Sequence, residues 1–250
     1  MYYNIKRKSV AIATNIEVTA LNKKKIDILA ECALFAGISA DTLSIMLDCL
    51  QPKISTHAKN SFITVEGEPY IGLGILLAGE ATVVKENVAG ARSVLTSLDK
   101  GDMFGEMIAF SARKTWPASV VAQSECTVVF LPPQKITGSC PHACDGHQRL
   151  IRNMLLIVSE KALMLNRKVE YLTIKSMRAK IATYLLEQHK HHAKKTFLMP
   201  LKRNDLADFL NVSRTAMSRE MGRMRDEGLI DFYRSSVKLT NIEKLLKVVE

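Results

Sequence analysis

The feature that most constrains the fold is a series of short β-type segments in the middle of the chain. Between residues 54 and 131, segments rich in Val, Ile, Thr and Phe alternate with turns that contain glycine. Many short strands at regular spacing are typical of a sandwich or barrel and argue against alternating β-α units. The predicted strands are Ser61–Val65, Leu73–Leu77, Ala81–Lys85, Ser93–Leu98, Ser119–Val121 and Thr127–Leu131.

Helical patterns lie on both sides of this β region. Residues 26–50 predict two short helices, and a polar connector from Thr137 to His147 precedes a long helix over residues 149–172. A stripe this long favours packing against a second copy of itself, as in a coiled coil. Lys161 and Lys168 interrupt the stripe, so packing on the β region alone stays open as an alternative. The stripe consists of Leu150, Met154, Ile157, Val158, Leu165, Val169 and Leu172.

Bulk properties narrow the class of protein. The 250 residues, 47% of them hydrophobic, are enough for two compact domains with real cores. No apolar run is long enough to cross a bilayer, and residues 1–25 lack the apolar centre of a secretory signal. The five cysteines are scattered rather than spaced as a disulfide framework. We therefore expect a cytoplasmic protein that is not associated with a membrane.

Charge is distributed unevenly along the chain. The formal net charge is +10, but residues 26–148 carry eight Lys and Arg against thirteen Asp and Glu, whereas residues 173–250 carry sixteen against nine. A basic C-terminal third next to an acidic body suggests a polyanionic partner for that third. A basic surface that serves only solubility is the alternative.

Residues 201–230 predict two short helices joined by a tight turn. The first begins at Asn204 or Arg203, and the small Ala207 lies where a second helix must cross closely. Asn211-Val212 forms the turn, and Ser213 is expected to cap the second helix with its hydroxyl. This geometry places the second helix in a major groove of DNA.

The second helix has one apolar and one polar side. Met217, Met221 and Met224 share the inward face by helical spacing. Since arginine can bond two acceptors of guanine at once, we predict base readers here, with serine and threonine as further base or phosphate contacts. The outward residues are Ser213, Arg214, Thr215, Ser218 and Arg219, with Arg214 and Arg219 as the base readers.

Two short strands, Leu229–Tyr233 and Ser236–Leu239, follow as a predicted wing, from which Arg234 and Lys238 could touch the DNA backbone. The alternative for the whole segment is an unrelated three-helix bundle. The short turn, the small residue at the crossing, the basic outward face and the hairpin together favour DNA binding.

Five motifs can be read along the chain: Glu66-Gly67-Glu68, Leu77-Ala78-Gly79-Glu80, Gly101-Asp102-Met103-Phe104-Gly105-Glu106, the long helix to Leu172, and Asn211-Val212-Ser213-Arg214 through Arg219. At these motifs the sequence resembles the CRP/FNR family of bacterial regulators over about residues 26–250. The resemblance implies an α+β fold without enzymatic activity. It divides the chain into a basic extension (1–25), a jelly-roll-like β-roll sensor domain (26–148), a dimerisation helix (149–172) and a winged helix-turn-helix (173–250).

The resemblance also implies partners: double-stranded DNA with an inverted-repeat operator, a second copy of the chain, a small effector, and RNA polymerase if the protein activates transcription. The family's recognition positions match Arg214, Thr215 and Arg219. Cyclic-AMP-responsive members carry an acidic residue where this chain has Thr215, so we expect a different operator.

One departure from the family concerns the effector. Nucleotide-binding relatives follow the segment that matches Gly105-Glu106 with an Arg-Ser pair that clamps the cyclic phosphate, but this chain has Trp116-Pro117 there, ahead of Ala118. We expect no cyclic AMP binding by that mode, and the effector is unknown. Trp116 either lines a pocket for an apolar or aromatic effector or only fills the core. The candidate pocket residues are Glu80, Gly105, Glu106, Trp116, Ala118 and Ser119, of which the two glutamates are more typical of backbone caps.

The connector offers a last candidate site. Cys140, His142, Cys144 and His147 supply enough soft donors for a metal or a thiol switch, although their spacing is not a standard zinc pattern and a simple linker is the favoured interpretation. Two other functions stay open: a metal-binding protein of the cupin type, and a sensor or regulatory subunit that does not bind DNA.

Overall fold

The computed structural model describes residues 15–17, 21–87, 90–138 and 145–249. The chain divides into two compact units, Met1–Ser159 and Glu160–Glu250. Within the described ranges, no helix is both long enough and apolar enough to cross a membrane.

The N-terminal unit contains two antiparallel sheets. The first has the strand order β1-β2-β9-β4-β7, and the second has the order β3-β8-β5-β6. The first sheet consists of β1 (Asn15–Glu17), β2 (Lys53–His57), β4 (Leu73–Ala78), β7 (Met103–Phe104) and β9 (Cys126–Leu131). The second consists of β3 (Phe62–Thr64), β5 (Ala81–Glu86), β6 (Arg92–Leu98) and β8 (Ser119–Ala122). This arrangement confirms the predicted β-roll.

Strands β4 and β9, which pair in the middle of the first sheet, are almost entirely apolar because both of their faces are buried. On β9, Val128 and Phe130 point into the core between the two sheets, whereas Val129 and Leu131 point into a second core on the other face. Successive side chains of a strand alternate between faces, so a sheet covered on both sides requires a continuous apolar run.

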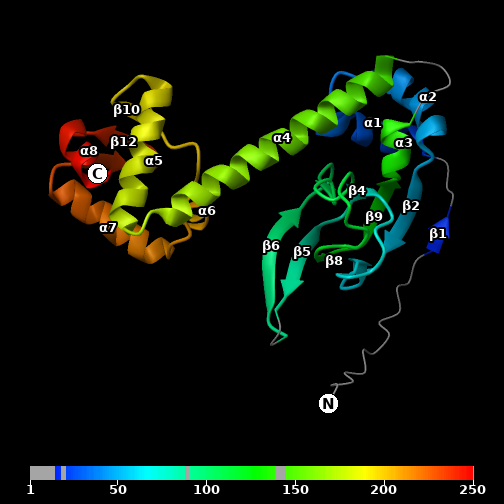
Figure 1. Cartoon of the computed structure of the whole chain (residues 1–250), viewed down its shortest axis with the longest axis horizontal. Helices are drawn as coiled ribbons and strands as arrows, with labels where there is room; N and C mark the ends of the chain where they lie inside the picture. The colour runs from blue at the N-terminus through cyan, green and yellow to red at the C-terminus, as the bar shows by residue number, and fades with distance from the viewer. Residues whose placement is uncertain (1–14, 18–20, 88–89, 139–144, 250) are drawn as a thin grey trace. The chain divides into compact units, whose positions relative to one another are not determined.

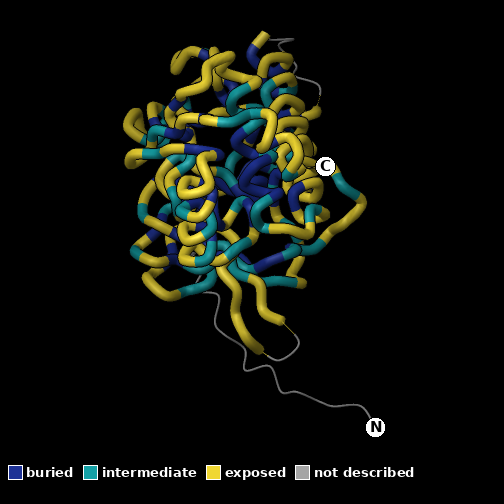
Figure 2. The backbone as a smooth tube through the Cα atoms, turned by 90° about the vertical axis from the view of Figure 1, so that its left-hand side faces the viewer, coloured by how far each residue is buried: buried dark blue, intermediate teal, exposed yellow. Residues whose placement is uncertain are grey.

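Helices supply the second core. They are α1 (Lys23–Glu31), the 3₁₀ turn η1 (Ala33–Phe35), α2 (Ala40–Leu50) and α3 (Pro133–Thr137), and they gather at one end of the β-roll (Figure 1). Leu29, Phe35 and Leu43 are completely buried there. The opposite end is more open, since β6 is exposed from Arg92 to Ser97 and the β5–β6 hairpin projects from the unit (Figure 2).

Helix α4 (Asp145–Thr173) contributes to the cores of both units. Leu150 and Met154 are buried in the N-terminal core, and Asn153 donates hydrogen bonds of 2.9 Å to the carbonyl oxygens of Leu34 and Ala36. Near its other end, Tyr171 is 1% exposed in the C-terminal core. The predicted intermolecular stripe is therefore wrong for Leu150, Met154 and Ile157, which pack within their own chain.

The C-terminal unit is built on α5 (Met177–His192), α6 (Arg203–Leu210), α7 (Arg214–Asp226) and α8 (Ile242–Val249). A three-stranded antiparallel sheet of order β10-β12-β11 completes it, formed by β10 (Thr196–Leu198), β11 (Ile230–Tyr233) and β12 (Ser236–Leu239). This is the predicted winged helix-turn-helix.

The interior of this unit contains one charged side chain, Lys180, among its described buried residues. Its Nζ donates a 3.0 Å hydrogen bond to the carbonyl oxygen of Leu210, at the end of α6. The last carbonyls of a helix lack intrahelical partners and carry partial negative charge, so a buried ammonium is stabilised there. Lys180 thus ties α5 to the end of the first helix of the helix-turn-helix.

Several sequence predictions are wrong in detail. Asn15–Glu17 pairs with β2, and α1 begins at Lys23, so the predicted N-terminal extension includes structured residues. Strands β1, β2, β7 and β10 were not predicted, and all of them are short or polar.

We predict that Gly74→Ala destabilises the β-roll. A Cβ atom on Gly74 of β4 would collide with the ring of Phe104, so the ring must shift within a packed core. We expect a loss of ~1–3 kcal/mol in the free energy of unfolding. Urea unfolding followed by the fluorescence of Trp116, the single tryptophan of the chain, measures it. An unchanged midpoint would show that the core accommodates the added methyl group.

Lys180→Met should destabilise the C-terminal unit. The change removes the donor and leaves the Leu210 carbonyl oxygen without that bond, at an expected cost of ~1–3 kcal/mol. Thermal unfolding followed by circular dichroism measures the loss, and Trp116 fluorescence should not change because it reports on the other unit. Lys190→Met, at an exposed position of the same helix, is the control. Equal melting curves for the two variants would contradict this role of Lys180.

Candidate nucleic-acid interface

The turn between α6 and α7 depends on two small structural details. Asn211 adopts a left-handed conformation with φ of 52°, which asparagine tolerates better than most residues. The backbone N–H of Val212 then donates a 3.0 Å hydrogen bond to the carbonyl oxygen of Ala207. Ala207 is 2% exposed, and its single methyl group lets the two helices cross closely.

Helix α7 is oriented by its three methionines. Met217, Met221 and Met224 are all 0% exposed and lie within the C-terminal core. Because these positions share one side of a helix, the opposite side must face solvent. Burial of the methionine face therefore determines which side chains α7 presents.

The predicted contact residues lie on that solvent side. Arg214, Thr215, Ser218 and Arg219 are all exposed. None of the ion pairs found among the described residues involves Arg214 or Arg219. The two guanidinium groups are thus accessible from solvent, and no carboxylate among the described residues pairs with them.

Ser213 differs from its prediction in one respect. It occupies the N-cap position of α7 and is exposed, but its hydroxyl makes no capping hydrogen bond. The amides of the first helical turn are therefore not occupied by this side chain, and the predicted side-chain cap is wrong.

The wing places its two cations differently. Arg234 lies in the turn between β11 and β12 with φ of 53°, and its guanidinium carbon is 5.4 Å from the centroid of the Tyr233 ring. Lys238 is exposed on the middle strand of the sheet, opposite Thr196 and Asp231. Arg234 is at the tip of the hairpin, and Lys238 is further from it.

An ion-pair cluster that was not predicted lies beside the recognition face. Arg178 of α5 donates from Nε to Glu220 (2.6 Å) and from its two terminal nitrogens to Glu227 (2.7 and 2.8 Å). The hydrogen bonds to Glu227 and then to Glu220 raise the pKa of Arg178, and those from Arg178 lower the pKa of Glu227. Arg178 and Glu220 are 42 residues apart, so no local sequence signal could have shown this contact.

Two other arginines, one from α6 and one from α7, pack against an aromatic ring of the wing. The guanidinium carbons of Arg203 and Arg225 lie 5.0 and 5.3 Å from the centroid of the Phe232 ring. Burial lowers the pKa of Arg203, whose side chain also contacts the sulfur of Met221. These two arginines support the wing, whereas Arg214 and Arg219 face solvent.

Two of the six candidate effector residues, Trp116 and Gly105, lie together in the core of the β-roll. The Trp116 side chain is 3% exposed, and its ring centroid is 4.6 Å from that of Tyr70 and 5.9 Å from that of Phe104. A Cβ atom on Gly105 would lie 2.7 Å from the indole. Trp116 is thus part of the core between the sheets, in line with the core-filling alternative.

The remaining candidates have distinct environments. Ala118 and Glu106 are both buried. Burial raises the pKa of the Tyr70 hydroxyl, and the charge of Glu106 raises it further. Ser119 accepts a 2.9 Å hydrogen bond from the backbone N–H of Glu66. Glu80 is exposed at a turn, where its backbone N–H donates to the Ser124 hydroxyl. The six residues therefore do not form one continuous surface.

The connector candidates are only partly covered by the structure. Cys140, His142 and Cys144 lie outside the described residues, and His147 is buried in the first turns of α4. Within the part of the chain that the structure describes, no three His, Cys, Asp or Glu side chains are grouped as metal ligands.

Comparisons with known proteins agree with this architecture. A family model described as a Crp-like helix-turn-helix domain matches residues 179–248, and one described as a cyclic nucleotide-binding domain matches residues 55–140. The chain is 20% identical over 227 residues to a Mycobacterium tuberculosis protein named CRP-like cAMP-activated global transcriptional regulator, covering 88% of this chain and 98% of that protein. It is 21% identical over 205 residues to the Cyclic AMP receptor protein of Thermus thermophilus, covering 79% and 87%.

Among solved structures, the crystal structure of the Thermus thermophilus Catabolite Activator Protein matches with 18% identity and a TM-score of 0.49, over 87% of this chain and 98% of that one. The two family matches together span more than half of the chain, in the order of the β-roll and the helix-turn-helix. This chain therefore belongs to the CRP/FNR family of transcription regulators.

Proposed function

We propose that this regulator binds an inverted-repeat operator as a homodimer and that its β-roll transmits a small-molecule or redox signal to the DNA-binding unit. The observation that carries the proposal is the solvent-facing side of α7, where Arg214 and Arg219 have no carboxylate partner among the described residues. Two exposed guanidinium groups without a carboxylate partner, on the second helix of a helix-turn-helix, fit the major groove of DNA.

Each contact residue has a distinct proposed role. Arg214 and Arg219 read base edges, since a guanidinium can bond the two acceptors of a guanine. Thr215 and Ser218 add base or phosphate contacts. Ser213 lies at the start of α7, where backbone amides favour a phosphate, and Arg234 and Lys238 contact the backbone from the wing. The operator differs from that of cyclic-AMP-responsive members because Thr215 replaces an acidic residue.

The exposed face of α4 supports the dimer. Apolar side chains recur there at alternating steps of three and four residues, the spacing of a coiled-coil seam. All of them except Leu155 follow Ile157, the last residue of the helix that packs on the N-terminal core. The seam consists of Leu155, Val158, Ala162, Leu165, Val169 and Leu172, all of which are exposed.

For the effector, the β-roll chemistry argues against the usual cyclic-nucleotide mode. A phosphate clamp needs a guanidinium, which presents two parallel N–H donors. The corresponding positions here hold Trp116, which is buried, and Pro117, which has no backbone N–H. We propose that cyclic AMP is not the effector and that the signal enters the β-roll by another route. A regulator of this kind that activates transcription would also contact RNA polymerase.

Base reading by Arg219 is tested directly by Arg219→Ala. With an operator selected from random duplexes, we expect a loss of ~1–3 kcal/mol in binding free energy and a loss of preference at one base pair per half-site. Lys247→Ala, which removes one exposed positive charge from α8, is the control for net charge. Operator binding by Arg219→Ala as tight as that of the control would contradict the role of Arg219.

The seam is tested by Leu165→Glu, which places a charge where two copies of α4 would meet. Sedimentation should show dissociation of the dimer, because a buried carboxylate without a partner is costly. Leu163→Glu is the matched control, since Leu163 is 64% exposed but lies on the opposite side of the same helix. A wild-type monomer, or equal effects of the two substitutions, would contradict the proposed seam.

A further inference from the structure

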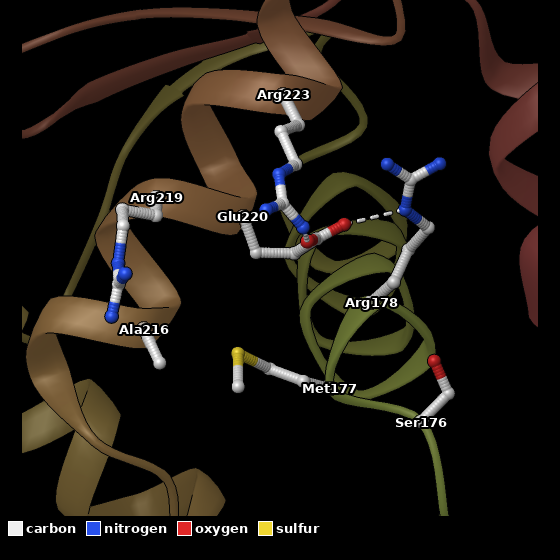
Figure 3. Close-up of a pocket in the computed structure, with 7 residues that line it drawn as sticks. All are labelled: Ser176, Met177, Arg178, Ala216, Arg219, Glu220 and Arg223. Atoms are coloured by element: carbon white, nitrogen blue, oxygen red, sulfur yellow. Dashed lines mark hydrogen bonds and ion pairs between the residues drawn. The ribbon is translucent and has the colours of Figure 1, made fainter.

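A groove runs between the start of α5 and one side of α7 (Figure 3). Its volume is about 480 Å³, and three of its seven lining residues are arginines. Arg219 also belongs to the proposed base-reading face, so the groove is continuous with that face. The lining residues are Ser176, Met177, Arg178, Ala216, Arg219, Glu220 and Arg223.

Glu220 lies among these arginines. Its side chain is 15% exposed, and its two oxygens accept hydrogen bonds from Arg178 Nε (2.6 Å) and from Arg223 (3.3 Å). Glu227 accepts hydrogen bonds from the two terminal nitrogens of Arg178. Three hydrogen bonds to two carboxylates therefore hold that guanidinium. The groove thus contains three arginines, and Glu220 in the groove and Glu227 outside it neutralise part of their charge.

The same donors would suit a phosphate of the DNA backbone. Guanidinium groups bind carboxylates and phosphates with the same forked geometry. A carboxylate held by two arginines therefore occupies the position that a phosphate would take, and its negative charge repels a phosphate that approaches. Arg178, with a side chain 30% exposed, and Arg223, at 71%, are near enough to the surface to meet DNA if they were released.

We propose that Glu220 is a specificity-determining residue that withholds Arg178 and Arg223 from sequence-independent contacts with the DNA backbone. This inference rests on the proposed DNA binding. Each phosphate that a protein neutralises strengthens its binding to any sequence, without information about the bases. By occupying two arginines internally, Glu220 leaves a larger share of the binding free energy to Arg214 and Arg219. It thereby raises the ratio of operator to non-specific affinity.

A purely structural role makes the opposite prediction for DNA binding. If the cluster only joins α5 to α7, removing the Glu220 charge lowers stability and leaves non-specific binding unchanged or weaker. If Glu220 withholds cations, its removal strengthens non-specific binding. The two roles are therefore separated by a measurement of DNA affinity rather than of folding.

The test compares Glu220→Gln with the wild-type chain on a random-sequence duplex at about 50 to 200 mM salt. Glutamine keeps the size and one acceptor, and Glu227 still holds Arg178, so α5 stays attached to α7. We expect about three- to tenfold tighter non-specific binding at the lowest salt, and a slope of log K against log salt that steepens by about 0.9 for each added phosphate contact, one per protomer. Operator affinity should rise less, so the specificity ratio falls.

Three further variants make the result interpretable. Glu243→Gln removes the same charge from an exposed position in the first turn of α8 and controls for net charge. Arg223→Gln in the Glu220→Gln background should remove most of the gain, because Arg223 is one of the released cations. Glu227→Gln, at the exposed end of α7, should act in the same direction as Glu220→Gln, and thermal melting of each variant confirms that it is folded.

The proposal is overturned if folded Glu220→Gln binds the random duplex no more tightly than Glu243→Gln, or if its gain survives Arg223→Gln. Failure of the proposed function gives a different result, because the wild-type chain would then show no salt-dependent binding to any duplex. Wild-type discrimination between operator and random duplex, measured in the same series, separates the two outcomes.

Discussion

The burial of Met217, Met221 and Met224 is the constraint on which the C-terminal unit depends. All three side chains are fully buried, so α7 cannot rotate about its axis without exposing them or inserting Arg214 and Arg219 into the core. Burying an unpaired guanidinium costs far more than the apolar burial returns. The burial of the methionines therefore determines which side of α7 faces solvent. Lys180 joins α5 to the end of α6, and Arg178 joins α5 to α7.

Helix α4 is held in place by side chains near each of its two ends. Its first half is held by Leu150, Met154 and Asn153 in the N-terminal unit, and Tyr171 belongs to the core of the C-terminal unit. Tyr171 donates a 2.7 Å hydrogen bond to Glu187 of α5, and Arg167 pairs with the same carboxylate, so the end of α4 is fastened to α5. The exposed apolar residues of α4 are consequently presented on a helix that is anchored at both ends.

The sequence predicted the parts of this structure that depend on local patterns. Each of these parts is indicated by residues that are close together in the sequence. They are strands β4 and β9, helices α6 and α7, and the wing. Strand β2 was missed because Lys53–His57 has a single apolar side chain, Ile54, and so lacks the alternation that indicates a strand. The long helix was predicted, but its periodicity could not separate Leu150, which packs on its own chain, from Leu165, which is exposed.

For the candidate interface, Arg214 and Arg219 were accessible to prediction because helical spacing alone sets them opposite the methionines. Glu220 was not, since its role depends on Arg178, which only the tertiary fold brings to it. Methylation interference on a selected operator tests the central claim most directly. The account predicts that methylation of guanine N7 in the major groove blocks binding at symmetric positions, in two half-sites about 34 Å apart. Interference confined to the minor groove, or to a single unpaired site, would contradict the assignment of α7 as the reader.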